Sequence, residues 1–192
     1  VSTRDSFAAI KNDGSVITWS SMGSYKSFSS KPIKEVFANA SAFAFLRTDG
    51  SVITSGNDEN GGDMGWKESL IQSGVKKIFS TQNAFAALKE DGSVITWGDK
   101  EFGGDSSSVE SELENGVIEV IGTLGYQYTK VGRDTGGAFA ALKKDGSVIT
   151  WGDKNSGGDS SSVSNDLSKG VVKIYANSRS FAALKNDGSV IT

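Results

Sequence analysis

The sequence predicts an all-β protein built from repeated antiparallel units, and the repeat itself is the main observation. The string DGSVIT occurs five times, beginning at Asp13, Asp49, Asp91, Asp145 and Asp187. Residues 84–109 and 138–163 differ at only three of 26 positions, which indicates a duplication. The spacings of 36, 42, 54 and 42 residues give a unit of about 42 residues, so the 192 residues hold one repeat domain.

Two short apolar segments flank each Asp-Gly pair, as in 85–89 before it and 93–97 after it. Asp-Gly between two such segments is a strong hairpin signal, because glycine tolerates a positive φ. We therefore expect the two segments to pair antiparallel through a type I′ turn. The second segment is rich in β-branched residues and apolar on both faces, which favours a strand packed between two neighbours.

A third strand is predicted in each of four units. The segments 33–36, 75–78, 117–120 and 171–174 carry apolar residues at their first and fourth positions. Three of them follow a glycine and the first follows Pro32. We expect these segments to complete small sheets of three to four antiparallel strands.

The polar stretch that joins one unit to the next has helical features. In the third unit it runs from Ser106 through Val109 and Leu113 to Gly116. A serine before an apolar i, i+4 pair and a glycine after it predict a helix of one to two turns with a serine N-cap. Three strands cannot bury both faces alone, so the units must stack, and a 42-residue antiparallel unit favours propeller blades over solenoid coils.

The predicted units divide the chain unevenly. They cover about 1–32, 33–74, 75–116, 117–170 and 171–192. Five hairpins accompany only four third strands, which predicts an incomplete ring of roughly four to five blades. An open ring exposes strand edges, so we expect either a fragment of a larger propeller or array, or self-association through the open ends.

The unit G-V-x-x-I, F-A-A-L-K-x-D-G-S-V-I-T-W-G resembles the repeat of the regulator of chromosome condensation family. Its compact blades resemble bacterial β-lactamase inhibitory proteins built on the same propeller. The resemblance implies a β-propeller module that displays a protein-binding surface, within a larger bacterial protein that is secreted or held at the cell surface. Phe43, Ser55 and the Gly-Gly-Asp turn depart from the family pattern, so the resemblance names no partner.

Composition excludes several classes of function. The chain has no cysteine and no histidine, which removes disulfides, thiol nucleophiles, imidazole bases and metal sites made of either group. With 20 basic and 23 acidic residues it has no broad cationic field, so we expect no nucleic-acid partner. No apolar run reaches about 18 residues, so we expect no membrane insertion. We expect no enzymatic activity and no cofactor.

Acidic residues gather in two kinds of place. Asp58, Asn60 and Asp63 present oxygens that suit Ca²⁺, but Asp, Asn and Gly are also the residues that tight turns require. We therefore expect no metal site, and keep a calcium- or carbohydrate-binding module and a structural spacer as alternative functions. The glutamates at 110, 112 and 114 become Ser, Asp and Ser in the next copy, which indicates a solvated helix face.

Residues that break the repeat are the candidates for recognition. The fourth unit carries a 12-residue insertion that includes Tyr126, Tyr128, Lys130 and Arg133, and insertions in repeat scaffolds map to loops. Trp66 lies in the second linker, where no other copy has tryptophan. We predict that these five residues contact a protein partner. Repeated tryptophans, by contrast, are expected to pack blades together.

Overall fold

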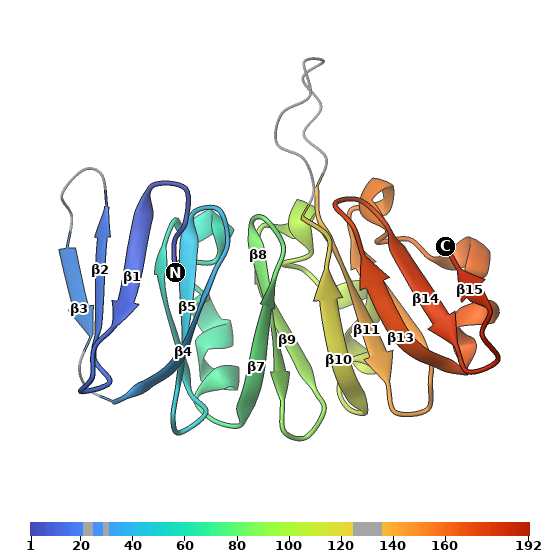
Figure 1. Ribbon diagram of the computed structural model, residues 1–192, viewed down its shortest axis with the longest axis horizontal. Coiled ribbons are helices and arrows are strands. Elements are labelled where there is room, and N and C mark those ends of the chain that lie inside the picture. The colour runs from blue at the N-terminus through green and yellow to red at the C-terminus, as the bar shows by residue number, and fades with distance from the viewer. Residues whose placement is uncertain (21–24, 29–30, 125–135) are drawn as a thin grey trace, which may run out of the picture.

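The computed structural model consists of five small antiparallel sheets that stand side by side in chain order (Figure 1). It describes residues 1–20, 25–28, 31–124 and 136–192. Each sheet has three strands, and the first and fifth sheets lie at opposite ends of the row. The predicted all-β fold of repeated propeller blades is confirmed.

The strands fall into five blades, numbered here in chain order. They are β1 (Ser6–Ile10), β2 (Val16–Ser20) and β3 (Tyr25–Phe28) in blade 1; β4 (Ile33–Ala38), β5 (Ala42–Arg47) and β6 (Val52–Gly56) in blade 2; β7 (Val75–Ser80), β8 (Ala84–Lys89) and β9 (Val94–Gly98) in blade 3; β10 (Val117–Gly122), β11 (Ala138–Lys143) and β12 (Val148–Gly152) in blade 4; and β13 (Val171–Ala176), β14 (Phe181–Lys185) and β15 (Val190–Ile191) in blade 5.

Short 3₁₀ helices connect blades 2 to 5. They are η1 (Asp58–Asn60), η2 (Gly65–Ile71), η3 (Lys100–Phe102), η4 (Ser107–Glu112), η5 (Lys154–Ser156), η6 (Ser161–Val163) and η7 (Asp166–Ser168). Among the residues that the structure describes, no helix is both long and apolar enough to span a membrane.

The predicted third strands are the inner strands of blades 2 to 5. Each of β4, β7, β10 and β13 pairs with the middle strand of its own sheet, and neighbouring inner strands contact one another. The pairing register shifts near the start of each inner strand, as between Val75 and Lys77. Blade 1 differs because β3 follows the hairpin and pairs with β2, its second strand, whereas in the other blades the inner strand precedes the hairpin and pairs with its first strand.

The Asp-Gly turns form the predicted hairpins, but they are not of type I′. In blade 3 the Lys89 N–H donates to Ser93 O (2.9 Å), and the Gly92 N–H donates to Lys89 O (3.0 Å). Gly92 has φ +81°, whereas no residue other than glycine has a positive φ among those described. A type I′ turn needs two positive φ angles, so this is a three-residue loop that ends in a glycine bulge.

The serine after each Asp-Gly pair explains why the three residues occur together. Asp91 Oδ1 accepts hydrogen bonds from the Ser93 hydroxyl (2.6 Å) and the Ser93 N–H (3.0 Å). The hydroxyl first, and then the backbone N–H, lower the pKa of the Asp91 carboxyl. The same pair of bonds occurs in the other four turns, so each hairpin is closed by its own side chains.

The predicted serine N-cap of the linker helix is wrong. Ser106 makes no side-chain capping bond, and its hydroxyl instead accepts from Thr96 Oγ1 (2.9 Å) in the adjacent strand. Asp105 precedes it and accepts from the Ser107 N–H (2.9 Å). A carboxylate is the stronger acceptor, and this leaves the hydroxyl free to bind the linker to its blade.

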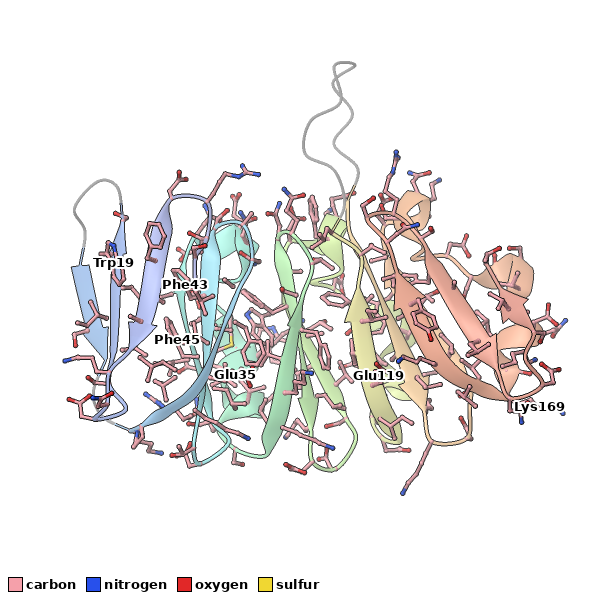
Figure 2. The ribbon with its side chains drawn as sticks, in the orientation of Figure 1. Trp19, Glu35, Phe43, Phe45, Glu119 and Lys169 are labelled. Carbon is pink, nitrogen blue, oxygen red and sulfur yellow. The ribbon has the colours of Figure 1, made fainter. Side chains whose placement is uncertain are left out.

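The hydrophobic core lies between the blades. In β5, Ala42, Ala44 and Leu46 face the cluster shared with blade 3, while Phe43 and Phe45 face the cluster shared with blade 1. Figure 2 shows these two phenylalanines on the side of β5 toward blade 1. The middle strands of blades 2 to 4 are thus buried on both faces, and a blade depends on its neighbours for its stability. The strand that was predicted to be packed between two neighbours, which follows the Asp-Gly pair, is instead the edge strand of these sheets.

Backbone hydrogen bonds join each blade to the next at the hairpin turns. The Val117 N–H of blade 4 donates to Gly92 O of blade 3 (3.0 Å), and Val75 and Val171 make the equivalent bonds to Gly50 and Gly146 (both 2.9 Å). A Cβ atom on Gly92 would lie 2.8 Å from the backbone N of Gly116. The glycine is therefore required by its own φ and by the backbone of the next blade.

We predict that Gly92→Ala destabilises the protein more than Gly74→Ala. Both glycines have positive φ, so both variants incur about 1–2 kcal/mol of backbone strain. Only Gly92 has backbone of the next blade in the way, since a Cβ on Gly74 would meet nothing closer than Lys89 Cε at 3.6 Å. Urea denaturation should show an excess loss of about 1–3 kcal/mol, the usual cost of overpacking. Equal losses would contradict the role of this contact.

We also predict that the hairpin aspartates make stability fall in acid. Their carboxyl pKa values are lowered in the folded state, so the stabilisation is present above the unfolded value of 3.8 and is lost as the pH falls through the folded values. Melting temperatures at about pH 5 and pH 2.5 measure the loss. The double variant Ser93→Ala/Ser147→Ala should lose less than the wild type over this interval, and an equal loss would sink the explanation.

Candidate partner-binding surface

The repeated tryptophans are used to pack one blade against the next. Trp97 and Trp151 are each only 2% exposed, and each stacks on the phenylalanine opposite it in the middle strand (ring centroids 5.4 Å apart). Their indole N–H groups donate to Gly61 O (3.2 Å) and Gly103 O (3.0 Å) in the linker of the preceding blade. The prediction that these residues pack blades is confirmed.

Blades 1 and 2 show what happens where the pattern is interrupted. Trp19 stacks on Phe7 (5.5 Å) but is 43% exposed, and Figure 2 shows it in the first blade of the row. In blade 2 the corresponding position is Ser55. A hollow of about 240 Å³ lies there, with Trp19, Phe43 and Ser55 in its wall. The small side chain leaves unfilled the space that tryptophan fills in blades 3 and 4.

Trp66 is the most exposed large apolar side chain among the described residues, at 72%. It is the second residue of η2, whose entry is fixed because Asp63 Oδ1 accepts from the Gly65 N–H (2.7 Å). The other end of η2 is anchored by Ile71, which is fully buried in the core between blades 2 and 3. The linker thus holds a bulky aromatic ring in solvent on a short element fixed at both ends.

Two hollows meet at Trp66. The first, called here the Trp66 groove, has a volume of about 230 Å³ and runs between η2 and η4 over strand β9. Its wall includes Trp66, Leu70, Val94 and Leu113. The second has about 460 Å³ and lies between η1 and the start of η2. Trp66 and Lys67 belong to both walls, so the ring stands on the ridge that separates them.

Carboxylates surround this ridge. Asp91, Glu110 and Glu114 line the Trp66 groove, while Asp58, Glu59 and Asp63 line the second hollow. The one cation in the two walls is Lys67, whose Nζ donates to Thr96 O (2.7 Å). Six carboxylates against one ammonium give these walls a formal charge of −5, compared with −3 for the whole chain.

The other residues that the sequence predicted to contact a partner belong to the insertion of the fourth unit. Tyr126, Tyr128, Lys130 and Arg133 lie outside the described residues.

In the acidic turn, Asn60 is bonded to its own blade. Its side-chain amide donates to Ser41 Oγ (3.1 Å), and its backbone carbonyl accepts from Asn39 Nδ2 (2.6 Å). Asp63 accepts the Gly65 N–H, as described above. Within the described ranges no three acidic side chains gather as a metal ion requires. These contacts give Asn60 and Asp63 a role in the turn itself.

Two groups at the surface were not predicted as site residues. Glu110 and Glu114 were interpreted as a solvated helix face, and the fold brings them across from Trp66, which is more than 40 positions away in the sequence. Lys89, a recurring lysine beside the hairpin turn, was interpreted as facing solvent, yet its Nζ donates to Leu70 O (3.1 Å) and fixes η2 to blade 3. The available signal was that Trp66, Glu110 and Glu114 all differ from their counterparts in the next copy.

No family model matches the chain, and no curated protein matches its sequence. The fold is nevertheless that of propellers of the RCC1 type. Human WBSCR16 superposes with a TM-score of 0.59 at 15% identity, over 98% of this chain and 59% of that one.

Two further solved structures are similar. Yeast RCC1 (Prp20), solved with Kap60, gives a TM-score of 0.56 at 18% identity, over 98% of this chain and 54% of that one. The CRINKLY ectodomain of the Arabidopsis thaliana receptor kinase ACR4 gives 0.55 at 15% identity, over 99% and 62%. The chain thus spans between half and two thirds of the length of these three proteins.

We predict that Trp151→Phe destabilises the protein while Trp19→Phe does not. Phenylalanine retains the stacking but cannot donate to Gly103 O, and a buried carbonyl left without its partner costs about 1–3 kcal/mol. Trp19 is exposed, so its replacement should change the unfolding free energy by less than about 0.5 kcal/mol. Urea denaturation of the two variants measures the difference. A loss at Trp19 as large as that at Trp151 would argue against the blade-packing role.

Proposed function

We propose that this chain is a non-catalytic propeller module that binds a protein partner at the linker surface around Trp66. The observation that carries the proposal is the 72% exposure of Trp66 on a linker that is itself firmly anchored. Tryptophan supplies a large contact area and is enriched among residues that dominate binding energy. An exposed ring between two hollows is the arrangement expected of an anchor residue before its partner arrives.

The other tryptophans support this assignment because two of them are buried between blades. Trp97 and Trp151 are committed to neighbouring blades, so they have no exposed ring to offer. The similar yeast RCC1 propeller was solved bound to another protein, Kap60, which supports a protein-binding role for the fold. The absence of histidine and cysteine from the sequence supports a role without catalysis.

The resemblance of the repeat to bacterial propeller proteins supports a proposal about the larger protein in which the module acts. We propose that the module acts within a bacterial protein that is secreted or held at the cell surface. The insertion with Tyr126, Tyr128, Lys130 and Arg133 is proposed as a second contact region. Self-association is proposed as a further property of the blades at the two ends of the row.

The test is a random-peptide display selection against the wild-type protein, followed by affinity measurements on the enriched peptides. We expect at least one family of peptides to bind the wild type and to bind Trp66→Ala at least about tenfold more weakly, which corresponds to about 1.4 kcal/mol. Tyr175→Ala is the matched control, since it removes a half-exposed aromatic ring at a different place, in strand β13.

Circular dichroism and melting temperature must first show that both variants remain folded. Peptides that lose affinity equally for Trp66→Ala and Tyr175→Ala would contradict the proposed surface. A selection that enriches no peptide would instead favour a structural spacer.

A further inference from the structure

We infer that the Trp66 groove recognises a cationic segment of the partner, with an arginine side chain laid over the Trp66 ring and its guanidinium held by the carboxylates of the groove. This inference rests on the proposed function, because it names the chemistry of the partner at the same surface. It follows from the shape of the groove, its charge and its difference from the next blade.

The floor of the groove is apolar and already built. Leu113 and Val94 are 1% and 6% exposed and form the floor of the groove. Leu70, from η2, is 38% exposed and lines the groove as well. Since both side chains of the floor belong to the core between blades 3 and 4, the floor does not have to be ordered on binding. An aliphatic side chain of a partner would find a preformed apolar surface beside Trp66.

The carboxylates at the rim come from two different elements. Asp91 lies in the hairpin turn of blade 3, and Glu110 and Glu114 come from η4 and the residues just after it. All three are exposed. The Ser93 hydrogen bonds lower the pKa of Asp91, so it stays ionised well below neutral pH.

Lys67 offsets only part of the negative charge of this rim. Its Nζ donates to Thr96 O (2.7 Å) and lies 5.9 Å from the centre of the Trp66 ring. A second ammonium lies next to the groove, since Lys89 Nζ donates to Leu70 O (3.1 Å). The six carboxylates of the two walls therefore outnumber the cations beside them. A cationic partner is attracted by this excess of carboxylates, whereas an acidic partner meets like charge.

The same surface one blade further along lacks the tryptophan ring and both glutamates, but keeps the hairpin aspartate as Asp145. Aligning Gly62 with Gly104 places Ser108 where blade 2 has Trp66, and aligning Gly104 with Gly158 places Ser164 and Ser168 where blade 3 has Glu110 and Glu114. The buried leucine is kept, because Leu167 replaces Leu113 in the core. The ring and the two glutamates therefore differ together while the packing residue does not, which separates recognition from folding.

Arginine fits this combination better than lysine. Its planar guanidinium stacks on aromatic faces and forms paired hydrogen bonds with carboxylates, whereas the lysine ammonium is a compact, strongly hydrated charge. Because the rim is solvent-exposed, the attraction is screened by salt, with a Debye length of about 10 Å at 0.1 M. The inference therefore predicts binding that weakens as the ionic strength rises.

The test uses a fluorescein-labelled short peptide that carries arginines and leucines in a serine-glycine background. Two companion peptides replace every arginine with citrulline, which is neutral and nearly isosteric, or with glutamate. Fluorescence anisotropy at about 25 mM salt measures their binding to the full chain. We expect the arginine peptide to bind at least about tenfold more tightly than the citrulline peptide, and the glutamate peptide not to bind.

Variants locate the binding. Trp66→Ala and the double variant Glu110→Gln/Glu114→Gln should each weaken the arginine peptide at least about tenfold, and the double variant should also reduce the dependence on salt. Glu112→Gln is the control, because it removes one carboxylate from the sequence position between the two glutamates, and Glu112 does not line the groove. It should leave the affinity within about twofold of the wild type.

A second variant tests whether these residues are sufficient. Ser108→Trp/Ser164→Glu/Ser168→Glu should create a second site on the next blade and raise the stoichiometry from one peptide to two. A peptide that binds regardless of its charge, or a Glu112→Gln effect as large as that of the double variant, would overturn the inference. If the display selection yields Trp66-dependent peptides that carry no excess of arginine, the proposed function stands and this inference fails.

Discussion

The joint between neighbouring blades is the contact on which the rest of the structure depends. In it, the first N–H of one blade donates to the hairpin glycine carbonyl of the blade before, as between Val117 and Gly92. The tryptophan N–H of the same blade donates to the preceding linker, as between Trp151 and Gly103. Because the hydrophobic clusters also lie between blades, a single sheet has neither a core nor satisfied edges of its own.

This joint explains which residues are repeated and which are free to differ. Glycine, aspartate, serine and tryptophan recur because each has a partner in its own turn, in the next blade or in the preceding linker. The linkers are constrained at a few positions: a buried apolar residue such as Ile71 or Leu113, and the glycine whose carbonyl accepts the tryptophan N–H. Their exposed positions are therefore available for Trp66 and Glu110 without loss of the fold.

Sequence was sufficient for the hairpins, the inner strands and the packing role of Trp97, because these depend on local signals that recur in several copies. It was not sufficient for the turn type, which depends on backbone angles that Asp-Gly alone does not determine. It also missed the groove, since Trp66 and Glu114 become neighbours of one hollow only through the stacking of blades 2 and 3. Ser106 was misassigned because the competing acceptor, Asp105, lies one residue earlier.

The central claim is that repeated tryptophans hold the blades together while the unrepeated one meets the partner, and one measurement addresses it directly. The four tryptophans give four indole N–H signals in a ¹⁵N-labelled sample, which can be followed by hydrogen exchange and by titration with the arginine-leucine peptide. The account predicts slow exchange and no peptide shift for Trp97 and Trp151, and fast exchange with a saturable shift for Trp66. Peptide shifts at Trp97 or Trp151, or a Trp66 signal that the peptide leaves unchanged, would contradict it.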